Sequence, residues 1–300
     1  MTPKLHGRVL VVGSLNLDFI IDSPIPKPGQ TILGKKFLKR AGGKGANQAV
    51  AASKITHQVW MSGCVGSDDE GAELIAALNT YGVNTEHVKK VNNQTGVAFV
   101  TVDTTGENAI TVISGANHSL VSDHIYEAIK IIQPDVLVMQ AENNMDVVAE
   151  LLSDENISAR KIFNLAPYQS LNKQILTMCD PLVVNEHEAC ELLGHGLNEE
   201  FHNAGNELLN ISKSAILTLG ARGAIVCENN VVKHFPARTV DVVRDTTGAG
   251  DGFVGSLAAY VASGYSLEDS TLRAIDFAGI AVSRTGGMSS YPEITELVTR

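Results

Sequence analysis

Short apolar runs alternate with amphipathic stretches along most of this 300-residue chain, and the alternation constrains the fold more than any other feature. The clearest apolar runs have the length of buried strands: Val9–Val12, Val59–Ser62, Val136–Gln140, Lys161–Asn164, Leu182–Val184 and Ala215–Leu219. Helical spacing is clearest at Asp68–Tyr81, Asp123–Gln133, Met145–Leu152 and Asn203–Ile211, with longer patterns at Gly248–Ser263 and Leu267–Ser283. Repeated strand–helix–strand units predict an α/β fold with helices on both faces of a mostly parallel sheet.

Two segments break this alternation. Residues 14–41 contain several prolines and short β-rich pieces at Phe19–Asp22, Thr31–Leu33 and Phe37–Leu38, but no helical pattern. Residues 95–114 contain two strand-like runs, Gly96–Val102 and Ala109–Ile113, joined by a turn at Thr104–Gly106. We expect a small separate β-sheet, inserted in these two pieces into one domain of residues 1–300, where it lies over the active site as a lid.

Charge and composition limit the classes of partner. The chain carries 23 basic and 33 acidic residues, for a formal net charge of −10, which disfavours a broad surface for nucleic acid or anionic lipid. The four cysteines, Cys64, Cys179, Cys190 and Cys227, lack metal-binding spacing and are expected to be reduced thiols. No signal-like segment or membrane-length apolar run occurs. We therefore expect a soluble, cytoplasmic protein that binds small molecules.

The segment Asp245–Asp251 (DTTGAGD) is the most informative about chemistry. It follows the strand-like run Thr239–Val243 and opens a helical pattern, where the first amides lack partners and the helix dipole is positive. The small residues Gly248, Ala249 and Gly250 predict an anion hole for a transferring phosphoryl group, with Asp251 beside it as a general base. The alternative is an ordinary glycine-rich turn in which Asp251 stabilises the helix start.

Rival phosphate motifs are missing from the sequence. No G-x-x-x-x-G-K-[ST] motif occurs, which excludes a P-loop enzyme. No G-x-G-x-x-G follows the first strand, which disfavours a dinucleotide-binding dehydrogenase.

Two further motifs follow predicted strands and allow two interpretations each. In the first, Thr218–Gly223 (TLGARG), Gly220 and Gly223 would allow a nucleotide to lie against the backbone. The alternative is that they only form a hairpin turn into the next strand. Asn185 and Glu188 have the spacing of a helix capping pair, and also oxygen atoms suited to organising Mg²⁺ and its waters.

A third group of polar residues suits a ligand with several hydroxyl groups. Asn16 and Asp18 share one face of an extended strand, which is either a hydroxyl-binding face or the solvent face of the lid. The glycine-rich Gly42–Asn47 (GGKGAN) predicts close approach of the backbone to a small ligand, with a lid hinge as the compatible alternative. Glu142 follows a buried strand. It is expected either to lie in the crevice where open α/β sheets bind ligands or to be an ordinary acidic residue of a surface loop.

With these motifs the sequence resembles the ribokinase-like (PfkB) family of carbohydrate kinases, from the first strand to Pro292. Its most specific stretches are Gly42–Asn47 with the following Gln48–Ala52, and Asp245–Asp251. The resemblance implies a three-layer α/β/α core, a β-sheet lid that often mediates dimerisation, and transfer of the γ-phosphate of ATP to the 5-hydroxyl of ribose. The alternatives are a kinase for another furanose (deoxyribose or a nucleoside) and a non-catalytic sugar- or nucleotide-responsive binding protein, which the intact Asp251 disfavours.

The resemblance also implies residue roles. The base would be Asp251, and the sugar would be held by Asn16, Asp18, Gly43, Lys44, Asn47, Glu142 and Asp251. The nucleotide would contact Asn185, Thr218, Gly220, Gly223 and Gly250, and Asn185 and Glu188 would organise Mg²⁺. An activating K⁺ would lie near the side chain or backbone of Asp245, Thr247, Ala281, Arg284, Gly286 and Ser290.

Several positions depart from the family pattern. Leu17 stands where a smaller residue is frequent, and Gly252 stands where a larger one is common. The segment Asn164–Pro167 (NLAP) replaces the usual Asn-Pro-Ala-Pro. Arg244 replaces an expected valine, where it would pair with Asp245 and disturb the cation site.

Overall fold

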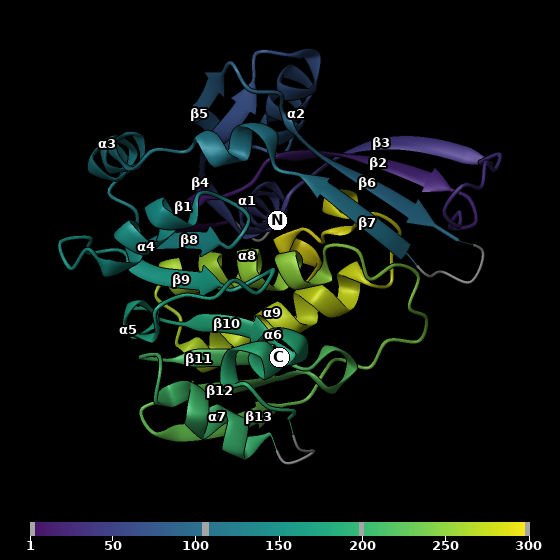
Figure 1. The fold of residues 1–300 in the computed structure, drawn as a ribbon. Helices are drawn as coiled ribbons and strands as arrows, with labels where there is room; N and C mark the ends of the chain where they lie inside the picture. Colours follow the sequence, from purple (N-terminus) through teal and green to yellow (C-terminus); the bar gives the residue numbers. More distant parts are fainter. Residues whose placement is uncertain (1–3, 104–107, 198–200, 298–300) are drawn as a thin grey trace.

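The larger sheet forms the centre of the computed structural model, which describes residues 4–103, 108–197 and 201–297 (Figure 1). Within this part of the chain the sheet has nine strands in the order β13-β12-β11-β10-β9-β8-β1-β4-β5. Their bounds are β1 Leu5–Val12, β4 Thr56–Gly66, β5 Asn84–Val91, β8 Val136–Gln140, β9 Arg160–Asn164, β10 Leu182–Asn185, β11 Ala215–Thr218, β12 Ala224–Glu228 and β13 Val231–Phe235. Along this order, every neighbouring pair from β11 through β10, β9, β8, β1 and β4 to β5 is parallel. In this sheet only the β11–β12 and β12–β13 pairs are antiparallel. The predicted mostly parallel sheet is confirmed.

Helices cover both faces of this sheet (Figure 1). Along β1, Val9 and Val11 belong to one buried cluster while Leu10 and Val12 belong to another, because alternate side chains point to opposite faces. The first cluster includes residues of α1 (Lys44–Ile55), α2 (Asp69–Thr80), α8 (Ala249–Ala262) and α9 (Leu267–Ala281). The second includes residues of α3 (Ser122–Ile132), α4 (Met145–Ser153), α5 (Lys173–Leu176), α6 (Glu186–Leu193) and α7 (His202–Leu209). This is the expected three-layer architecture.

A second, four-stranded sheet projects from the main body, in the order β3-β2-β6-β7 (Figure 1). Its strands are β2 Asn16–Asp22, β3 Lys36–Gly42, β6 Gly96–Val102 and β7 Asn108–Ile113, so it combines two distant segments as predicted. Asn16 to Asp22 pair antiparallel with β3 and parallel with β6. The run Thr31–Leu33 forms no strand, and the expected turn Thr104–Gly106 lies outside the described residues.

The prediction of a strand at Thr239–Val243 is wrong. Within the described residues this segment pairs with no strand. Val242 and Val243 are exposed, and the amides of Arg244 and Asp245 donate to the carbonyl of Val282, just after α9. The β-branched residues have strand propensity, but a strand also requires a neighbouring edge to bond to.

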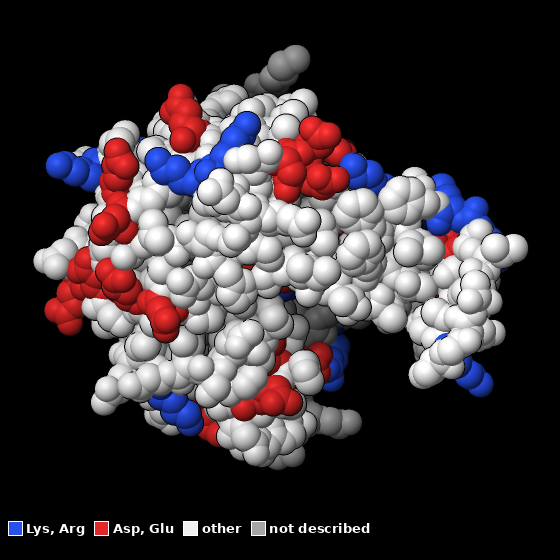
Figure 2. All heavy atoms as spheres, turned by 45° about the horizontal axis from the view of Figure 1, so that its top comes forward, with Lys and Arg blue, Asp and Glu red and all other residues white. Residues whose placement is uncertain are grey.

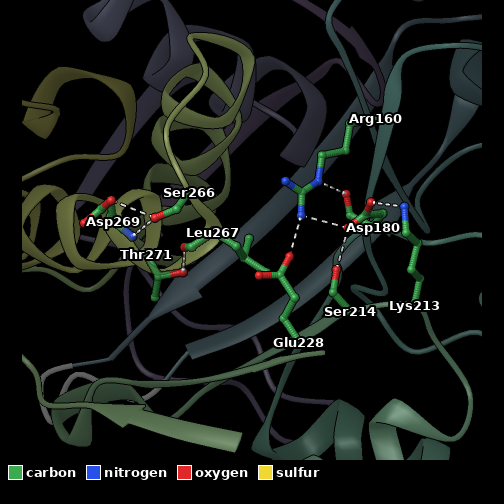
Figure 3. Close-up of polar contacts among 9 residues, drawn as sticks. All are labelled: Arg160, Asp180, Lys213, Ser214, Glu228, Ser266, Leu267, Asp269 and Thr271. Atoms are coloured by element: carbon green, nitrogen blue, oxygen red, sulfur yellow. Dashed lines mark hydrogen bonds and ion pairs between the residues drawn. The ribbon is translucent and has the colours of Figure 1, made fainter. Parts of the chain in front are cut away.

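Ion pairs close the end of the sheet where β9, β10 and β11 begin (Figure 3). Arg160 donates to the carboxylate of Asp180 at 2.8 Å and to that of Glu228 at 3.2 Å. Lys213 and Ser214 also donate to Asp180, at 2.8 and 2.6 Å. Burial opposes ionisation, but Lys213, Ser214 and Arg160 together hold the pKa of Asp180 below its usual value. This network lies away from the carboxyl ends of the strands.

The four cysteines are free thiols, as predicted, and Cys64, Cys179 and Cys227 are buried. Within the described ranges, no helix combines the length and the apolar content required to span a bilayer.

Candidate active site

Asp251 lies in the first turn of α8, where side chains of α1 hold its carboxylate. Asn47 Nδ2 donates to Oδ2 at 2.9 Å, and Gln48 Nε2 donates to Oδ1 at 3.0 Å. The two helices approach closely because residue 255 is glycine: a Cβ there would lie 2.1 Å from the carbonyl oxygen of Gln48. Asp251 is 9% exposed, so its carboxylate is largely buried but still reachable.

The backbone before α8 provides two amides for an anion rather than the expected three. Gly248 has a φ of 73°, the left-handed conformation that glycine adopts without strain, and its carbonyl accepts from Tyr291 Oη at 2.8 Å. The amide of Ala249 donates to the carbonyl of Thr246, whereas those of Gly248 and Gly250 have no acceptor within the described chain. A Cβ at Gly250 would meet no heavy atom within 4 Å, so the space beside this helix start is open.

Asn16 and Asp18 face the site from strand β2. Asn16 is buried, and its Oδ1 accepts from Asn117 Nδ2 at 2.8 Å. Burial, Glu142 and Asp251 raise the pKa of Asp18 to about 7, and Arg40, which lies opposite Asp18 on β3, acts in the other direction. Polar side chains on this strand therefore converge with Glu142 and Asp251, and the interpretation as a solvent face is wrong.

Glu142 follows β8 and is tied to the start of α1. Its Oε2 accepts from Ser14 Oγ at 2.6 Å and from the amide of Lys44 at 3.3 Å, so it is not a plain surface acid. Lys44 lies among carboxylates: Asp251 raises its pKa most, against the effect of burial, with further contributions from Glu142 and Glu188. The ammonium group thus balances part of the negative charge of the site.

The glycines of the Gly42–Asn47 motif make room for the protein itself. Gly43 has a φ of 89°, and a Cβ there would lie 2.8 Å from the amide nitrogen of Asn16. A Cβ at Gly42 would collide with the carboxylate of Asp18, and one at Gly45 with Gly13. The motif therefore packs the start of α1 against β1 and β2, and places Lys44 and Asn47 beside Asp251. Close approach of this backbone to a ligand stays a prediction.

A cleft of about 330 Å³ extends from Asn16 and Glu142. The sequence interpretation missed several of its polar lining residues: Asn117, His118, Asn143, Asn144, Asp146 and Gln169. The pair Asn143 and Asn144, directly after the buried strand and Glu142, was a signal that could have identified part of this wall. Figure 2 shows a hollow between the projecting sheet and the main body, with charged side chains at its edge.

The predicted nucleotide residues lie at the carboxyl ends of neighbouring strands. Asn185 of β10 is in register with Thr218 of β11. Residues Gly220–Arg222 form a 3-10 turn. The amide of Leu219 donates to the carbonyl of Gly223 across this turn, which joins the antiparallel strands β11 and β12, so the hairpin-turn interpretation is confirmed. Gly220 has a φ of 54° and open space beside its Cα, whereas a Cβ at Gly223 would collide with the carbonyl oxygen of Phe235.

Asn185 and Glu188 form a complete capping box at the start of α6. Glu188 N donates to Asn185 Oδ1 at 2.9 Å, and Asn185 N donates to Glu188 Oε2 at 2.8 Å. Burial raises the pKa of Glu188, although the bond from Asn185 and the charge of Lys44 oppose that shift. No cluster of three or more histidine, cysteine or acidic side chains suited to a metal occurs in the described ranges. The capping interpretation is confirmed, and the role in organising Mg²⁺ stays a prediction.

Two of the predicted monovalent-cation residues, Thr247 and Gly286, contact Asp245. Its carboxylate accepts from the amides of Thr247 and Gly286, both at 2.9 Å. Burial alone would raise the pKa of Asp245, but these bonds and the charge of Arg40 lower it. The described residues include no ion pair between Arg244 and Asp245, so the predicted disturbance by Arg244 is not found.

Three other residues named for this cation already make bonds of their own. The carbonyl of Ala281 accepts from the amide of Arg284 at 3.0 Å, and the Arg284 side chain pairs with Glu296. Ser290 Oγ donates to the carbonyl of Gly287 at 2.8 Å. The bonds from Thr247 and Gly286 to the Asp245 carboxylate come from backbone amides, so the cation site stays a prediction.

Comparisons with known proteins agree with this geometry. Residues 7–294 match the family described as pfkB family carbohydrate kinase. A ribokinase of Schizosaccharomyces pombe is 35% identical over 306 residues, covering 97% of this chain and 96% of the relative. The crystal structure of a Thermotoga maritima ribokinase has a TM-score of 0.89 at 32% identity, covering 97% and 98% of the two chains. An Arabidopsis thaliana ribokinase complexed with ribose and ATP has a TM-score of 0.87 at 27% identity, covering 98% of each chain.

Proposed function

The chain belongs to the pfkB family of carbohydrate kinases, and we propose that it transfers the γ-phosphoryl group of ATP to the 5-hydroxyl of D-ribose. The observation that carries the proposal is the position of Asp251, whose carboxylate lies between unpaired helix-start amides and the polar cluster of Asn16, Asp18 and Glu142. Relatives of full length that are ribokinases, one with ribose and ATP bound, support the choice of substrates.

In this mechanism Asp251 is the general base. The 5-hydroxyl oxygen attacks the γ-phosphorus while its proton passes to the Asp251 carboxylate. The bond from the γ-phosphorus to the bridging oxygen of ATP breaks, and its electron pair leaves with ADP. Asn47 and Gln48 hold the carboxylate in place, so the reacting groups start from a fixed geometry.

The helix start and Lys44 stabilise the charge that is transferred. The amides of Gly248 and Gly250 point from a positive helix end, where they can donate to the oxygens of the phosphoryl group. Lys44 adds a full positive charge close to Asp251. Because these groups are already in position, little reorganisation is needed as the reaction proceeds.

Sugar recognition is assigned to the polar residues around the cleft. Asn16, Asp18 and Glu142 provide amide and carboxylate groups for the ring hydroxyls, and Asn47, which bonds to the base, provides a further amide. Gly43 and Lys44 contribute the backbone and charge at the start of α1.

The nucleotide and Mg²⁺ are assigned to the neighbouring strand ends. Thr218, Gly220 and Gly223 would contact the nucleotide, and Asn185 and Glu188 would orient the waters of Mg²⁺. Only one oxygen of Glu188 is bonded within the described residues, which leaves the other for such a water. Bound Mg²⁺ would neutralise phosphate charge. The group around Asp245 would hold K⁺ and so order the loop before α8.

The four-stranded sheet is proposed to act as the lid and as the surface of a homodimer. Phe37, Phe19 and Phe99 stack across β3, β2 and β6, with ring centroids 5.9 and 5.3 Å apart. Alternation along β2 places Phe19 on the face opposite Asp18, so this aromatic row points away from the site. A partly exposed apolar row of this kind suits burial against a second copy. A cytoplasmic location remains a prediction, in agreement with the free thiols.

The test is ADP release by the purified protein with ribose, deoxyribose, other pentoses and nucleosides, with and without Mg²⁺ and K⁺. We expect the highest kcat/KM with ribose and a product phosphorylated at the 5-oxygen, identified by NMR. No sugar-dependent ADP release with any of these acceptors would refute the proposal.

A further inference from the structure

Three buried amide side chains form a connected group behind Asp251. Gln48 is on α1, Gln140 ends β8 and Asn164 ends β9, and the first two are completely inaccessible to solvent. The mechanism above assigns a role only to the contact between Gln48 and Asp251. An apolar core would normally exclude such side chains, because a buried polar group must be bonded to avoid destabilising the fold.

The hydrogen bonds allow only one orientation of the Gln48 amide. Its Nε2 donates to Asp251 Oδ1 at 3.0 Å and to Asn164 Oδ1 at 3.1 Å, and its Oε1 accepts from Gln140 Nε2 at 2.7 Å. Rotating the amide by half a turn would bring its oxygen against two acceptors and its nitrogen against a donor. Asn164 is itself held, since its Nδ2 donates to the carbonyl of Val183.

Gln140 is the least satisfied member of this group. Its Oε1 is buried and has no hydrogen-bond partner within the described residues. The atom occupies the space beside Gly13, where a Cβ would lie 2.2 Å from it. For the fold alone, an apolar side chain of similar size would be better at this position. A role that depends on the bond from Gln140 to Gln48 explains why an amide is there.

We propose that Gln48 is a positioning residue for the catalytic base, and that Gln140 acts on the base through Gln48. Each oxygen of Asp251 receives one amide N–H, Oδ2 from Asn47 and Oδ1 from Gln48. Two donors on opposite oxygens fix the rotation of the carboxylate about its bond to Cβ. The remaining lone pairs then face the sugar hydroxyl in a constant direction. This inference rests on the proposed function, because it assumes that Asp251 accepts a proton.

A purely structural role predicts different behaviour. If the amides only joined α1 to the sheet, replacing them would change the free energy of unfolding, and effects on turnover would follow stability. If they position the base, turnover falls by more than the loss of stability accounts for. The double variant removes both partners of the Gln48–Gln140 bond together, so it separates the two effects most clearly. The two roles are therefore separable by measuring kcat, ribose KM and unfolding on the same variants.

The experiment is a double-mutant cycle of Gln48→Met and Gln140→Met in the full-length protein. We expect Gln48→Met to lower kcat on the order of tenfold to a hundredfold with ribose KM nearly unchanged, and Gln140→Met to lower it less. The double variant should be no worse than Gln48→Met alone, because Gln140 acts only through Gln48. Additive losses of kcat would overturn the role of Gln140.

Two further variants test whether the hydrogen-bond donor of Gln48 matters, and whether any change at a buried polar residue of α1 lowers kcat. Gln48→Glu keeps the shape but replaces the donor with an acceptor facing Asp251, so it should lose more activity than Gln48→Met. Ser53→Ala is the matched control, because Ser53 is buried on the same helix and, within the described residues, its hydroxyl bonds only to the carbonyl of Val50. We expect it to retain the parent kcat.

Failure of this inference is distinguishable from failure of the proposed function. An active parent whose Gln48→Met variant keeps full kcat overturns the positioning role and leaves the kinase assignment intact. A parent that phosphorylates no sugar overturns both.

Discussion

Asn47 and Asp251 are 204 residues apart in the sequence, yet their side chains meet in a hydrogen bond of 2.9 Å. The bond joins the glycine-rich start of α1 to the start of α8, the two stretches that are the most distinctive in the sequence. Close packing at Gly255 brings the two helices together, and this packing places the carboxylate beside side chains that we propose bind the sugar.

Removing the charge of Asp251 should stop the reaction and leave the sugar bound. We expect Asp251→Asn to lower kcat by about a hundredfold to ten-thousandfold, because the amide cannot accept the hydroxyl proton. ADP release measures turnover, and calorimetry measures ribose affinity. Asp241→Asn, at an exposed position outside the site, is the control. Parent-like turnover of Asp251→Asn would remove it as the base.

Replacement by alanine should reduce turnover at Gly250 and stability at Gly255. A Cβ at Gly250 meets only open space, so Gly250→Ala should fold normally but lose turnover on the order of a hundredfold by displacing the phosphoryl group. Gly255→Ala should destabilise the fold by about 1–3 kcal/mol, because its Cβ collides with the carbonyl of Gln48. Urea unfolding and ADP release distinguish them. Full activity of Gly250→Ala would contradict an anion site at this position.

The raised pKa of Asp18, about 7, predicts a pH dependence of stability. Because the folded value lies above the unfolded one, the stabilising effect of the protonated group is complete below about pH 4 and is lost as pH rises through 7. Asp18→Asn should therefore be more stable than the parent at pH 8, with the difference in unfolding free energy disappearing by pH 4. Asp22→Asn, on the same strand, is the control. An equal difference at both pH values would contradict the raised pKa.

For Asp180 we expect the opposite dependence of stability on pH. Its pKa is lowered in the folded state, so its contribution is present above the unfolded value and is lost as pH falls through the folded one. Asp180→Asn should lower the free energy of unfolding by about 1–3 kcal/mol at neutral pH and by less in acid. Since this network lies at the opposite end of the sheet, kcat should be unchanged. A loss of turnover without loss of stability would be inconsistent with this role.

Asn117 should affect sugar affinity through Asn16. It donates to Asn16 Oδ1 at 2.8 Å and bonds to both backbone groups of Leu15. Asn117→Ala should raise ribose KM more than it lowers kcat, and destabilise the protein by about 1–3 kcal/mol through unpaired buried groups. Asn93→Ala, which removes an exposed bond to Ser119, is the control. An unchanged ribose KM would show that Asn117 does not hold Asn16 for the sugar.

Much of the fold follows from local patterns. The apolar runs at Val9–Val12 and Val136–Gln140 are strands of the parallel sheet because a strand buried on both faces must be apolar throughout. Thr239–Val243 is also rich in valine but is not a strand, and it pairs with none of the described strands. The residue types of a segment indicate whether it can form a strand. Whether it does form one depends on an adjacent strand to which its backbone can hydrogen-bond.

The sequence by itself determined the α/β class, the small sheet built from two segments, and the distinctive segments Gly42–Asn47 and Asp245–Asp251, because periodicity and residue type are local properties. Tertiary structure alone decided that the motif glycines make room for Asp18 and Asn16, that Ala249 uses its amide internally, and that Gln140 reaches Asp251 through Gln48. Burial, hydrogen bonding and pKa depend on which atoms lie within a few ångströms of one another. Those neighbours come from positions as distant in sequence as 48 and 251.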